Sequence, residues 1–431
     1  MLTVGFYTLG CKVNQQETSA VAAKFRASGF REVAFDSPAD IYVINTCVVT
    51  RQAEQKSQAL AKRQKKKHPT AFMVLAGCFP QVAADKASAL GMDLVVGSND
   101  KGRIVELVQE VLAKEEQQVH VTPWGADTAF EVVAEDYSTD RARATLKVQD
   151  GCEQYCAYCI IPYARGPERS LPLIAVRQQA QALLKQGYKE IILSGIHLGA
   201  YGRDLRPELS LAMLVDALAE LPGLVRLRLG SVEPTDVSAE LISAFSRQEK
   251  TCRHLHIPLQ SGSLAVLERM GRHYSPQDFS EMVHSLRQAL PGIGITSDVI
   301  VGFPGESDHD FQESLEFVKS MEFTRLHVFR YSRRPGTRAA DMKEQILDSV
   351  KDDRYAAMQQ VAGASQQRFH SSQLGKSVEV LVEKEPGELR VGHTSSYLKV
   401  AFPGPIELMG QVVSVQVIGV SPDGVVGEIA K

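Results

Sequence analysis

Three cysteines stand close together in the stretch DGCEQYCAYCIIPYARG, residues 150–166. They are Cys152, Cys156 and Cys159, with the spacing C-x3-C-x2-C. Thiolate sulfur is a soft ligand that selects zinc, copper(I) or iron–sulfur clusters. A structural zinc site closes with four ligands, but no histidine and no fourth cysteine lies within twenty residues of this triplet. Three ligands suit a 4Fe–4S cube, which normally takes four cysteines, with one iron kept open for substrate. A zinc site completed by a distant ligand, or three unligated thiols, are the alternatives.

The N-terminal part of the chain alternates between two kinds of hydrophobic pattern. Short apolar runs predict strands, and longer amphipathic stretches predict helices between them. This alternation is typical of a doubly wound parallel sheet. The predicted strands are 3–7, 41–44 and 72–75, and the predicted helices are 15–28, 51–67 and 104–112.

Each of these three predicted strands is followed by a cysteine. Cys11 follows the first strand in TLGC, Cys47 the second in NTC, and Cys78 the third in AGC. In an open parallel sheet the carboxyl ends of the strands share the edge where ligands bind. A single buried cysteine after a strand needs no special role, but three at the same edge indicate a shared ligand. We therefore expect a second cluster with three protein ligands and one open iron.

The central part of the chain repeats a strand–helix unit six times. A closed barrel of this type needs eight units, so six predict an incomplete barrel with a lateral opening wide enough for folded RNA. Catalytic groups of such barrels lie at the carboxyl ends of the strands, where the loop of Cys152 falls. The predicted strands are 144–148, 190–193, 225–229, 254–259, 294–301 and 325–331, and helices include 173–186, 211–220 and 308–321.

Other groups at the predicted barrel mouth are candidates for binding. Ser194 and Gly195 end the second strand, Glu233 follows the third, Gln260 ends the fourth, and GFPGE, residues 302–306, ends the fifth. Glycines there allow close approach of the backbone to a ligand, and Glu233 could hold a ribose or an ammonium group. Ordinary turn chemistry is the alternative for each. The seventh cysteine, Cys252, has no partner nearby in the sequence and is interpreted as a small buried apolar residue.

The C-terminal part changes to short strands after a long predicted helix, 341–371. Five strands separated by Gly, Pro and Asp predict a small β-barrel of a kind that often binds RNA. Its five Lys and Arg are outnumbered by seven Asp and Glu, so RNA contact would need specific groups such as Arg390, Tyr397 and Lys399. The predicted strands are 377–382, 389–391, 397–402, 411–420 and 425–429.

Length and composition set the remaining limits. The 431 residues suggest about three domains, which we place at 1–112, 141–371 and 372–431, with a linker at 113–140. The net charge of −3 gives no global attraction to nucleic acid. However, residues 51–67 carry seven Lys or Arg and one Glu, which indicates either a phosphate contact or a solvated helix face. The odd number of cysteines, and the lack of a signal peptide or long apolar run, predict a cytoplasmic protein without membrane contact.

The triplet of Cys152, Cys156 and Cys159 resembles the signature of the radical S-adenosylmethionine (SAM) superfamily. That superfamily usually has an aromatic residue before the third cysteine, and Tyr158 fills this place. The resemblance implies that SAM binds the open iron and is cleaved reductively to a deoxyadenosyl radical. It implies little about the substrate.

The order of the three predicted domains resembles the methylthiotransferase family of radical SAM enzymes, whose C-terminal module is a TRAM domain. The runs TLGCKVNQQET, NTCVVTRQAEQKS, LKVQDGC, CIIPYARG, PLQSGS and DVIVGFPGE are similar to the branch that acts on N6-threonylcarbamoyladenosine in tRNA. Gln16, Arg333 and Arg338 depart from that branch, which often has Tyr at the first position and Pro at the other two. These departures concern substrate preference and leave the cysteines intact.

The resemblance implies a tRNA methylthiotransferase that adds a methylthio group to C2 of this nucleoside beside the anticodon. It implies two 4Fe–4S clusters, at Cys11, Cys47 and Cys78 and at the catalytic triplet, with SAM contacts that include Tyr158, Gly195 and Glu233. It also implies a reductant of the flavodoxin or ferredoxin type. The alternatives are relatives that modify isopentenyladenosine in tRNA or a ribosomal protein, and a non-catalytic, metal-bound RNA-binding scaffold.

Overall fold

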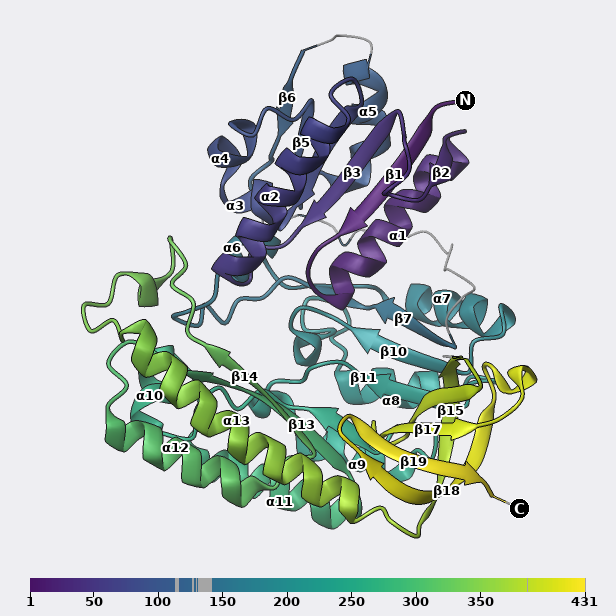
Figure 1. The fold of residues 1–431 in the computed structure, drawn as a ribbon, viewed down its shortest axis with the longest axis vertical. Coiled ribbons are helices and arrows are strands. Elements are labelled where there is room, and N and C mark those ends of the chain that lie inside the picture. The colour runs from purple at the N-terminus through teal and green to yellow at the C-terminus, as the bar shows by residue number, and fades with distance from the viewer. Residues whose placement is uncertain (113–115, 126–127, 129, 131–141, 386, 431) are drawn as a thin grey trace. The chain divides into compact units, whose positions relative to one another are not determined.

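The computed structural model describes residues 1–112, 116–125, 128, 130, 142–385 and 387–430. Most of the predicted linker lies outside the described residues. The chain divides into two compact units (Figure 1). The first comprises Met1–Ser138, Gln149–Leu171 and Ser332–Ala340, and the second comprises Thr139–Val148, Pro172–Tyr331 and Asp341–Lys431. Both cysteine triplets therefore belong to the first unit, while the proposed three-domain boundaries stay a prediction.

The first unit is built on a six-stranded parallel sheet with the order β2-β1-β3-β4-β5-β6. The predicted doubly wound sheet is confirmed. Three short strands were not predicted, and one of them, β6, comes from the region interpreted as linker. The strands are β1 (Thr3–Thr8), β2 (Arg31–Val33), β3 (Ile41–Thr46), β4 (Phe72–Gly77), β5 (Leu94–Gly97) and β6 (Gln118–His120).

Helices cover both faces of this sheet because side chains of a strand alternate between its faces. Ile41 and Val43 of β3 lie in one apolar cluster with residues of α1 and α5. Tyr42 and Ile44 lie in a second cluster with residues of α2, α3 and α4. The helices are α1 (Lys12–Ala27), α2 (Arg51–Lys67), α3 (Cys78–Val82), α4 (Ala84–Ser88) and α5 (Ile104–Leu112).

Two further short strands frame the cysteine-rich loop of the first unit. β8 (Gln149–Asp150) pairs antiparallel with β9 (Arg169–Ser170), and α6 (Ile161–Arg165) lies between them in the sequence. Ile160 and Ala164 belong to the second apolar cluster of the sheet. The loop is therefore packed onto the parallel sheet that carries the other cysteines.

The second unit contains the six parallel strands predicted for an incomplete barrel. They form two three-stranded sheets, β11-β10-β7 and β12-β13-β14, joined by parallel bridges between Leu227 and Thr251 and between Ser231 and His256. The strands are β7 (Arg143–Lys147), β10 (Glu190–Ser194), β11 (Arg226–Leu229), β12 (His254–His256), β13 (Gly294–Val301) and β14 (Arg325–Arg330). The helices are α7 (Leu173–Lys185), α8 (Leu211–Ala219), α9 (Ala239–Arg247), α10 (Leu264–Met270), α11 (Pro276–Ala289), α12 (Asp308–Met321) and α13 (Asp348–Ser371).

Two predicted elements extend three or more residues beyond the observed ones. β12 ends at His256 rather than at 259, because Pro258 has no N–H for the ladder. The long helix begins at Asp348 rather than at 341. The preceding segment bonds to the GFPGE loop instead, since the Gly305 amide donates to the Glu344 carbonyl at 2.8 Å.

The C-terminal strands close into a small barrel with the order β15-β16-β17-β19-β18 (yellow-green to yellow in Figure 1). The predicted five-stranded barrel is confirmed. Its strands are β15 (Ser377–Lys384), β16 (Leu389–Thr394), β17 (Lys399–Pro403), β18 (Val412–Ser421) and β19 (Gly424–Ile429). Within the part of the chain that the structure describes, no helix is both long and apolar enough to cross a membrane.

Candidate metal centres

The three cysteines of the sheet edge follow neighbouring strands at the point where the strand order reverses. Cys11 precedes α1 after β1, Cys47 follows β3, and Cys78 begins α3 after β4. The helices leaving β1 and β3 cover opposite faces, so the crevice between those strands is the usual ligand site of such a sheet. The expectation that these side chains share one edge agrees with this placement.

Close packing at Gly10 shows how near the first two cysteine loops lie. Gly10 has φ of +109°, and a Cβ built there would stand 2.8 Å from Cys47 Cβ and 3.0 Å from Cys47 Sγ. A side chain at position 10 would therefore clash with a cysteine and strain the backbone. The glycine of TLGC is needed for the approach of Cys11 to Cys47.

Asn14 holds the same two loops together. Its Nδ2 donates to the Leu9 carbonyl at 2.8 Å and to the Thr46 carbonyl at 3.0 Å; these residues come just before Gly10 and just before Cys47. Asn45 Nδ2 donates in turn to the Asn14 carbonyl at 3.1 Å. Since Asn14 is 1% exposed, these bonds are shielded from water and fix the edge.

The thiols of this edge act on one another electrostatically. Burial raises the pKa of the Cys47 thiol, and the neighbouring Cys78 and Cys11 raise it further, while a backbone hydrogen bond from Val49 and the Arg165 guanidinium lower it. Cys47 and Cys78 are buried and Cys11 is exposed. A metal or cluster would replace the thiol protons. Three converging soft donors, with one reachable from solvent, fit an iron–sulfur cluster.

The second triplet lies on a loop fixed at several points by backbone bonds. The Cys152 amide donates to the Gly166 carbonyl at 3.1 Å, and the Cys159 amide to the Cys156 carbonyl at 3.0 Å. Gly151 has φ of +76°, and a Cβ there would lie 1.8 Å from the Pro167 carbonyl oxygen. The loop therefore depends on glycine directly before its first cysteine.

The 332–340 segment braces the other side of this loop. The Ala339 amide donates to the Ala157 carbonyl at 2.8 Å, and the Arg338 guanidinium donates to the Tyr155 carbonyl at 3.1 Å. Arg338, where the resembled branch is expected to have Pro, therefore has a structural role. The other such position, Arg333, donates to the Ala340 carbonyl at 2.7 Å.

Sulfur spacing separates a cluster from a single zinc ion. Zn–S bonds of about 2.3 Å in a tetrahedron place sulfurs roughly 4 Å apart. Among the described residues, neither cysteine triplet has all three sulfurs within 4.8 Å of one another. In each triplet at least one pair of sulfurs therefore lies farther apart than 4.8 Å. Their assignment as cluster ligands stays a prediction.

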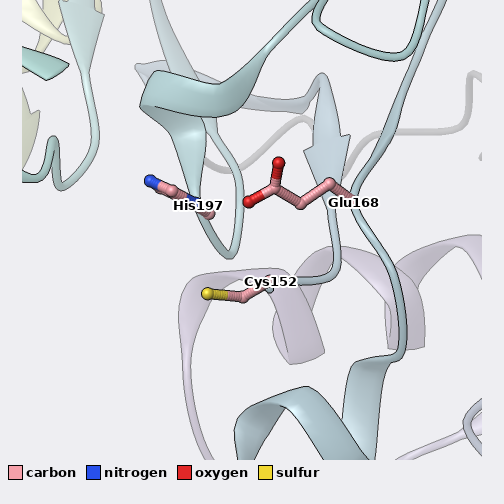
Figure 2. Close-up of side chains that lie close together, drawn as sticks. All are labelled: Cys152, Glu168 and His197. Carbon is pink, nitrogen blue, oxygen red and sulfur yellow. The ribbon is translucent and has the colours of Figure 1, made fainter. Parts of the chain in front are cut away.

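One carboxylate near the second triplet was missed in the sequence. Cys152 and Glu168 offer ligand atoms within 4.8 Å of each other, and Figure 2 shows both side chains from this unit. Glu168 lies directly before β9, which pairs with the strand entering the cysteine loop. Only the antiparallel pairing, invisible in the sequence pattern, brings it to Cys152.

The predicted SAM contacts fall in both units. Tyr158 belongs to the first unit, and Gly195 and Glu233 belong to the second, at the ends of the adjacent strands β10 and β11. The Glu233 carboxylate pairs with the Arg272 guanidinium, which also lies over the Tyr274 ring at 5.1 Å. Arg272 therefore fixes Glu233 at the mouth of the half-barrel, and nothing in the sequence pattern marked it.

His197, labelled in Figure 2, has its own partners in the second unit. Its Nε2 lies 2.7 Å from Asp236 Oδ2, and Arg203 pairs with the other carboxylate oxygen at 2.5 Å. Burial alone would raise the pKa of Asp236, but the hydrogen bond and charge of His197, together with Arg203, lower it. This buried pair steadies the two loops that follow β10 and β11.

The predicted turn groups at β12 and β13 are structural. Gln260 has φ of +66°, and its backbone pairs with β13 on both sides, at 2.8 Å to Asp298 and 2.9 Å to Ile300. Glu306 of GFPGE accepts from the Gly302 amide at 2.7 Å and pairs with Arg354 of α13 at 2.7 Å. Gln260 therefore extends the pairing with β13, and Glu306 anchors the long helix. Cys252 is 1% exposed, which agrees with a buried apolar role.

A histidine–aspartate–histidine group crosses three adjacent strands of the half-barrel. Asp298 of β13 lies 3.2 Å from His256 of β12 and 3.0 Å from His327 of β14. Burial acts to raise the pKa of Asp298, but the hydrogen bonds from both histidines outweigh it and lower the pKa to about 2. The aspartate is therefore an anion that holds two imidazoles.

The residues expected to carry RNA contacts of the C-terminal barrel are engaged within the unit. Arg390 is 6% exposed and donates to the carbonyls of Pro405, Gly387 and Leu389. The Tyr397 ring is stacked between His254 at 4.8 Å and His393 at 4.9 Å. Both side chains have partners within the unit, and their contact with RNA stays a prediction.

The basic helix is partly tied to its own unit. Lys65 donates to the Gly91 carbonyl and lies 3.7 Å from Asp93. Lys67 donates to the Asp36 carbonyl at 3.3 Å. Lys66 is exposed on the same helix end, where the partial negative charge of the helix favours cations. Both explanations of the basic helix stay open.

Comparison with known proteins gives matches along the whole chain. Residues 146–318 match the family described as the Radical SAM superfamily, and residues 3–97 match Uncharacterized protein family UPF0004. The chain is 38% identical over 424 residues to the threonylcarbamoyladenosine tRNA methylthiotransferase MtaB of Bacillus subtilis, covering 97% of this chain and 94% of that one. It is 40% identical to the protein of the same name from Thermotoga maritima, covering 99% and 96%.

More distant matches are also informative. The chain is 32% identical to a tRNA-2-methylthio-N(6)-dimethylallyladenosine synthase of Clostridium tetani, covering 95% of this chain and 92% of that one. Among solved structures, the radical SAM methyltransferase TsrM from Kitasatospora setae has a TM-score of 0.59 at 12% identity, covering 78% of this chain and 73% of that one. That likeness concerns the fold alone.

Proposed function

Because the chain belongs to the methylthiotransferase family of radical SAM enzymes, we propose that it modifies tRNA. It adds a methylthio group to C2 of N6-threonylcarbamoyladenosine next to the anticodon. The observation that carries this proposal is the full-length similarity, at 38% and 40% identity, to two relatives named for that activity. The motif around Cys11, GCKVN, supports the same branch.

Cys152, Cys156 and Cys159 would hold the 4Fe–4S cluster that the radical SAM family implies. SAM cleaved reductively there supplies the radical chemistry that the C2–H bond of adenine requires, since that hydrogen is not acidic enough for a general base. The chain positions the ligands through Gly151, whose conformation no other residue adopts without a clash, and through the brace at Ala339.

Tyr158, Gly195 and Glu233 are the proposed contacts of SAM. Glu233 is an anion held by Arg272, and an anion suits the amino group or ribose hydroxyls of SAM. Glu168, which lies within 4.8 Å of Cys152, adds a second carboxylate suited to the amino group. Positioned charges of this kind bind and orient a cofactor while the cofactor carries the hard chemistry.

Cys11, Cys47 and Cys78 would hold a second, auxiliary 4Fe–4S cluster. In this family, the sulfur that becomes the methylthio group is associated with that cluster. The support is that the three cysteines follow neighbouring strands at one edge of the sheet, with Gly10 and Asn14 holding the Cys11 and Cys47 loops together. The partner macromolecule is tRNA, and a reductant of the flavodoxin or ferredoxin type completes the system. Such an enzyme works in the cytoplasm, without a membrane.

An assay with purified protein tests this proposal. The protein is reconstituted anaerobically with iron and sulfide, then incubated with SAM, dithionite and tRNA carrying either threonylcarbamoyladenosine or isopentenyladenosine. Nucleoside mass spectrometry should detect the 2-methylthio product from the first tRNA only. Product from the isopentenyl tRNA only would assign the chain to the other branch. A colourless, zinc-containing protein that binds tRNA without SAM cleavage would support a non-catalytic scaffold.

A further inference from the structure

Arg165, the last residue of α6, is buried beside the sheet-edge cysteines. Its side chain is 2% exposed, and its guanidinium pairs with the Glu17 carboxylate and donates to the Asn14 side-chain oxygen. Asn14 is the residue that clamps the Cys11 and Cys47 loops. Arg165 also follows Cys159 by only six positions. This side chain therefore links the cysteine-rich loop directly to the auxiliary cysteines of the same unit.

Both carboxylates that pair with Arg165 also pair with another buried cation. Glu17 already pairs with Lys101, whose side chain is 3% exposed. Asp150, the other carboxylate near Arg165 at 3.6 Å, also pairs with Arg169 at 3.4 Å. Arg165 therefore shares each of these carboxylates with another buried cation. A buried cation is stabilised by further negative charge beside it.

The auxiliary site lies close to this guanidinium. Cys11 Sγ lies 3.9 Å from the Asn14 side-chain oxygen, the same oxygen to which Arg165 donates. Arg165 Nε is also buried without a hydrogen-bond partner among the described residues. A buried N–H donor needs an acceptor, and the sulfurs of an anionic cluster are acceptors.

We propose that Arg165 is a positioning residue of the auxiliary site, which supplies the charge and a hydrogen bond that hold the bound cluster and raise its reduction potential. This inference rests on the auxiliary cluster proposed above. Hydrogen bonds to sulfur and nearby charge are established controls of cluster potential. A cation beside the cluster favours the reduced form, which carries one more negative charge.

The test isolates the auxiliary cluster in the full chain. Cys152, Cys156 and Cys159 are all replaced by Ala, so that iron, the electron paramagnetic resonance signal and the midpoint potential report on the auxiliary site alone. Arg165→Met is then introduced. This variant should fold, because Glu17 keeps Lys101 and Asp150 keeps Arg169. Arg165→Lys keeps the charge but loses the Nε–H donor.

For Arg165→Met, the ratio of reduced to oxidised cluster at a fixed potential should fall about tenfold, a shift of about 59 mV for a one-electron couple. Arg165→Lys should recover part of this shift. Arg334→Met is the matched control, since Arg334 is another buried arginine of the unit, paired with Glu54. The control should leave the potential unchanged, whereas a merely structural effect would be similar in both variants.

Two results would overturn the inference, and they are distinguishable. If the triple Ala protein binds no iron after reconstitution, there is no auxiliary cluster, and the two-cluster proposal falls with the inference. If it binds a full 4Fe–4S cluster whose potential is unchanged by Arg165→Met, only the role of Arg165 is refuted. Loss of iron binding in the Arg165→Met variant, with an intact thermal transition, supports the role of Arg165 in holding the cluster.

Discussion

Replacing Arg228 by Met should destabilise the second unit through the joint between its half-barrel and its C-terminal barrel. Arg228 Nε lies 2.6 Å from Glu190 Oε1, and both side chains are at most 2% exposed. The guanidinium also donates to the carbonyls of Ser395 and Thr394 at 3.1 Å and lies over the Tyr397 ring at 4.8 Å. The Arg228 side chain therefore makes hydrogen bonds to both the half-barrel and the C-terminal barrel.

The size of the destabilisation follows from the buried Glu190 carboxylate, which loses its main partner. Arg228→Met leaves Glu190 buried, with Arg226 at 3.9 Å as its remaining ion-pair partner in the described structure. Breaking a buried pair from one side costs about 3–5 kcal/mol. For a unit of this size each kcal/mol lowers the melting temperature by roughly 2–4 °C, so a fall of about 10 °C is expected. The double variant Glu190→Gln/Arg228→Met removes the stranded charge and should recover part of the loss.

Urea denaturation followed by circular dichroism, with fluorescence as a second probe, measures this effect. Arg247→Met is the matched control, because Arg247 pairs with Asp216 at 2.7 Å but is 54% exposed. An exposed pair contributes less than about 1 kcal/mol. If Arg228→Met is no more destabilising than Arg247→Met, the buried joint does not hold the two barrels together and the reasoning is refuted.

Three further outcomes follow from the site. The pKa of Asp298 is lowered to about 2, so ionised Asp298 contributes on the order of 2 kcal/mol to the free energy of unfolding above about pH 4, and this contribution is lost as the pH falls toward about 2. Urea titrations at several pH values should show this loss in the native protein and not in Asp298→Asn. Equal acid profiles of the two proteins would exclude it. Cys152→Ala should halve the bound iron and abolish SAM cleavage, whereas Cys47→Ala should halve the bound iron but leave SAM cleavage measurable. Full methylthiolation of tRNA by Cys47→Ala would disprove the auxiliary site. Replacing Lys65, Lys66 and Lys67 together by Ala should weaken tRNA binding and flatten its salt dependence; an unchanged salt slope in filter-binding assays would leave the solvated-face explanation.

The architecture was predictable because its signals are local. Strand and helix periodicities place β1, β3 and β4, and the rule that carboxyl ends share an edge predicts that Cys11, Cys47 and Cys78 lie at the same edge. The short strands β2, β5 and β6 are three or four residues long, too short for a period to emerge. β12 was predicted to be too long because the apolar pattern continues past Pro258. The hydrogen-bond ladder ends there, because proline has no N–H.

The supporting side chains could not be predicted for a different reason. Arg165 meets Glu17 across 148 positions of sequence, and Arg228 meets Thr394 across 166. Such pairs depend on how distant segments pack together, so no residue spacing in the sequence predicts them. For the same reason, the sequence does not show that Tyr397 and Arg390 have partners within the unit.

The measurement that tests the central claim most directly is nucleoside mass spectrometry of tRNA from a strain that lacks this protein. The account predicts loss of 2-methylthio-N6-threonylcarbamoyladenosine and accumulation of N6-threonylcarbamoyladenosine, restored by the native chain and not by Cys47→Ala or Cys152→Ala. An unchanged level of the 2-methylthio nucleoside in that strain, or loss of the methylthio-isopentenyl nucleoside instead, would contradict it.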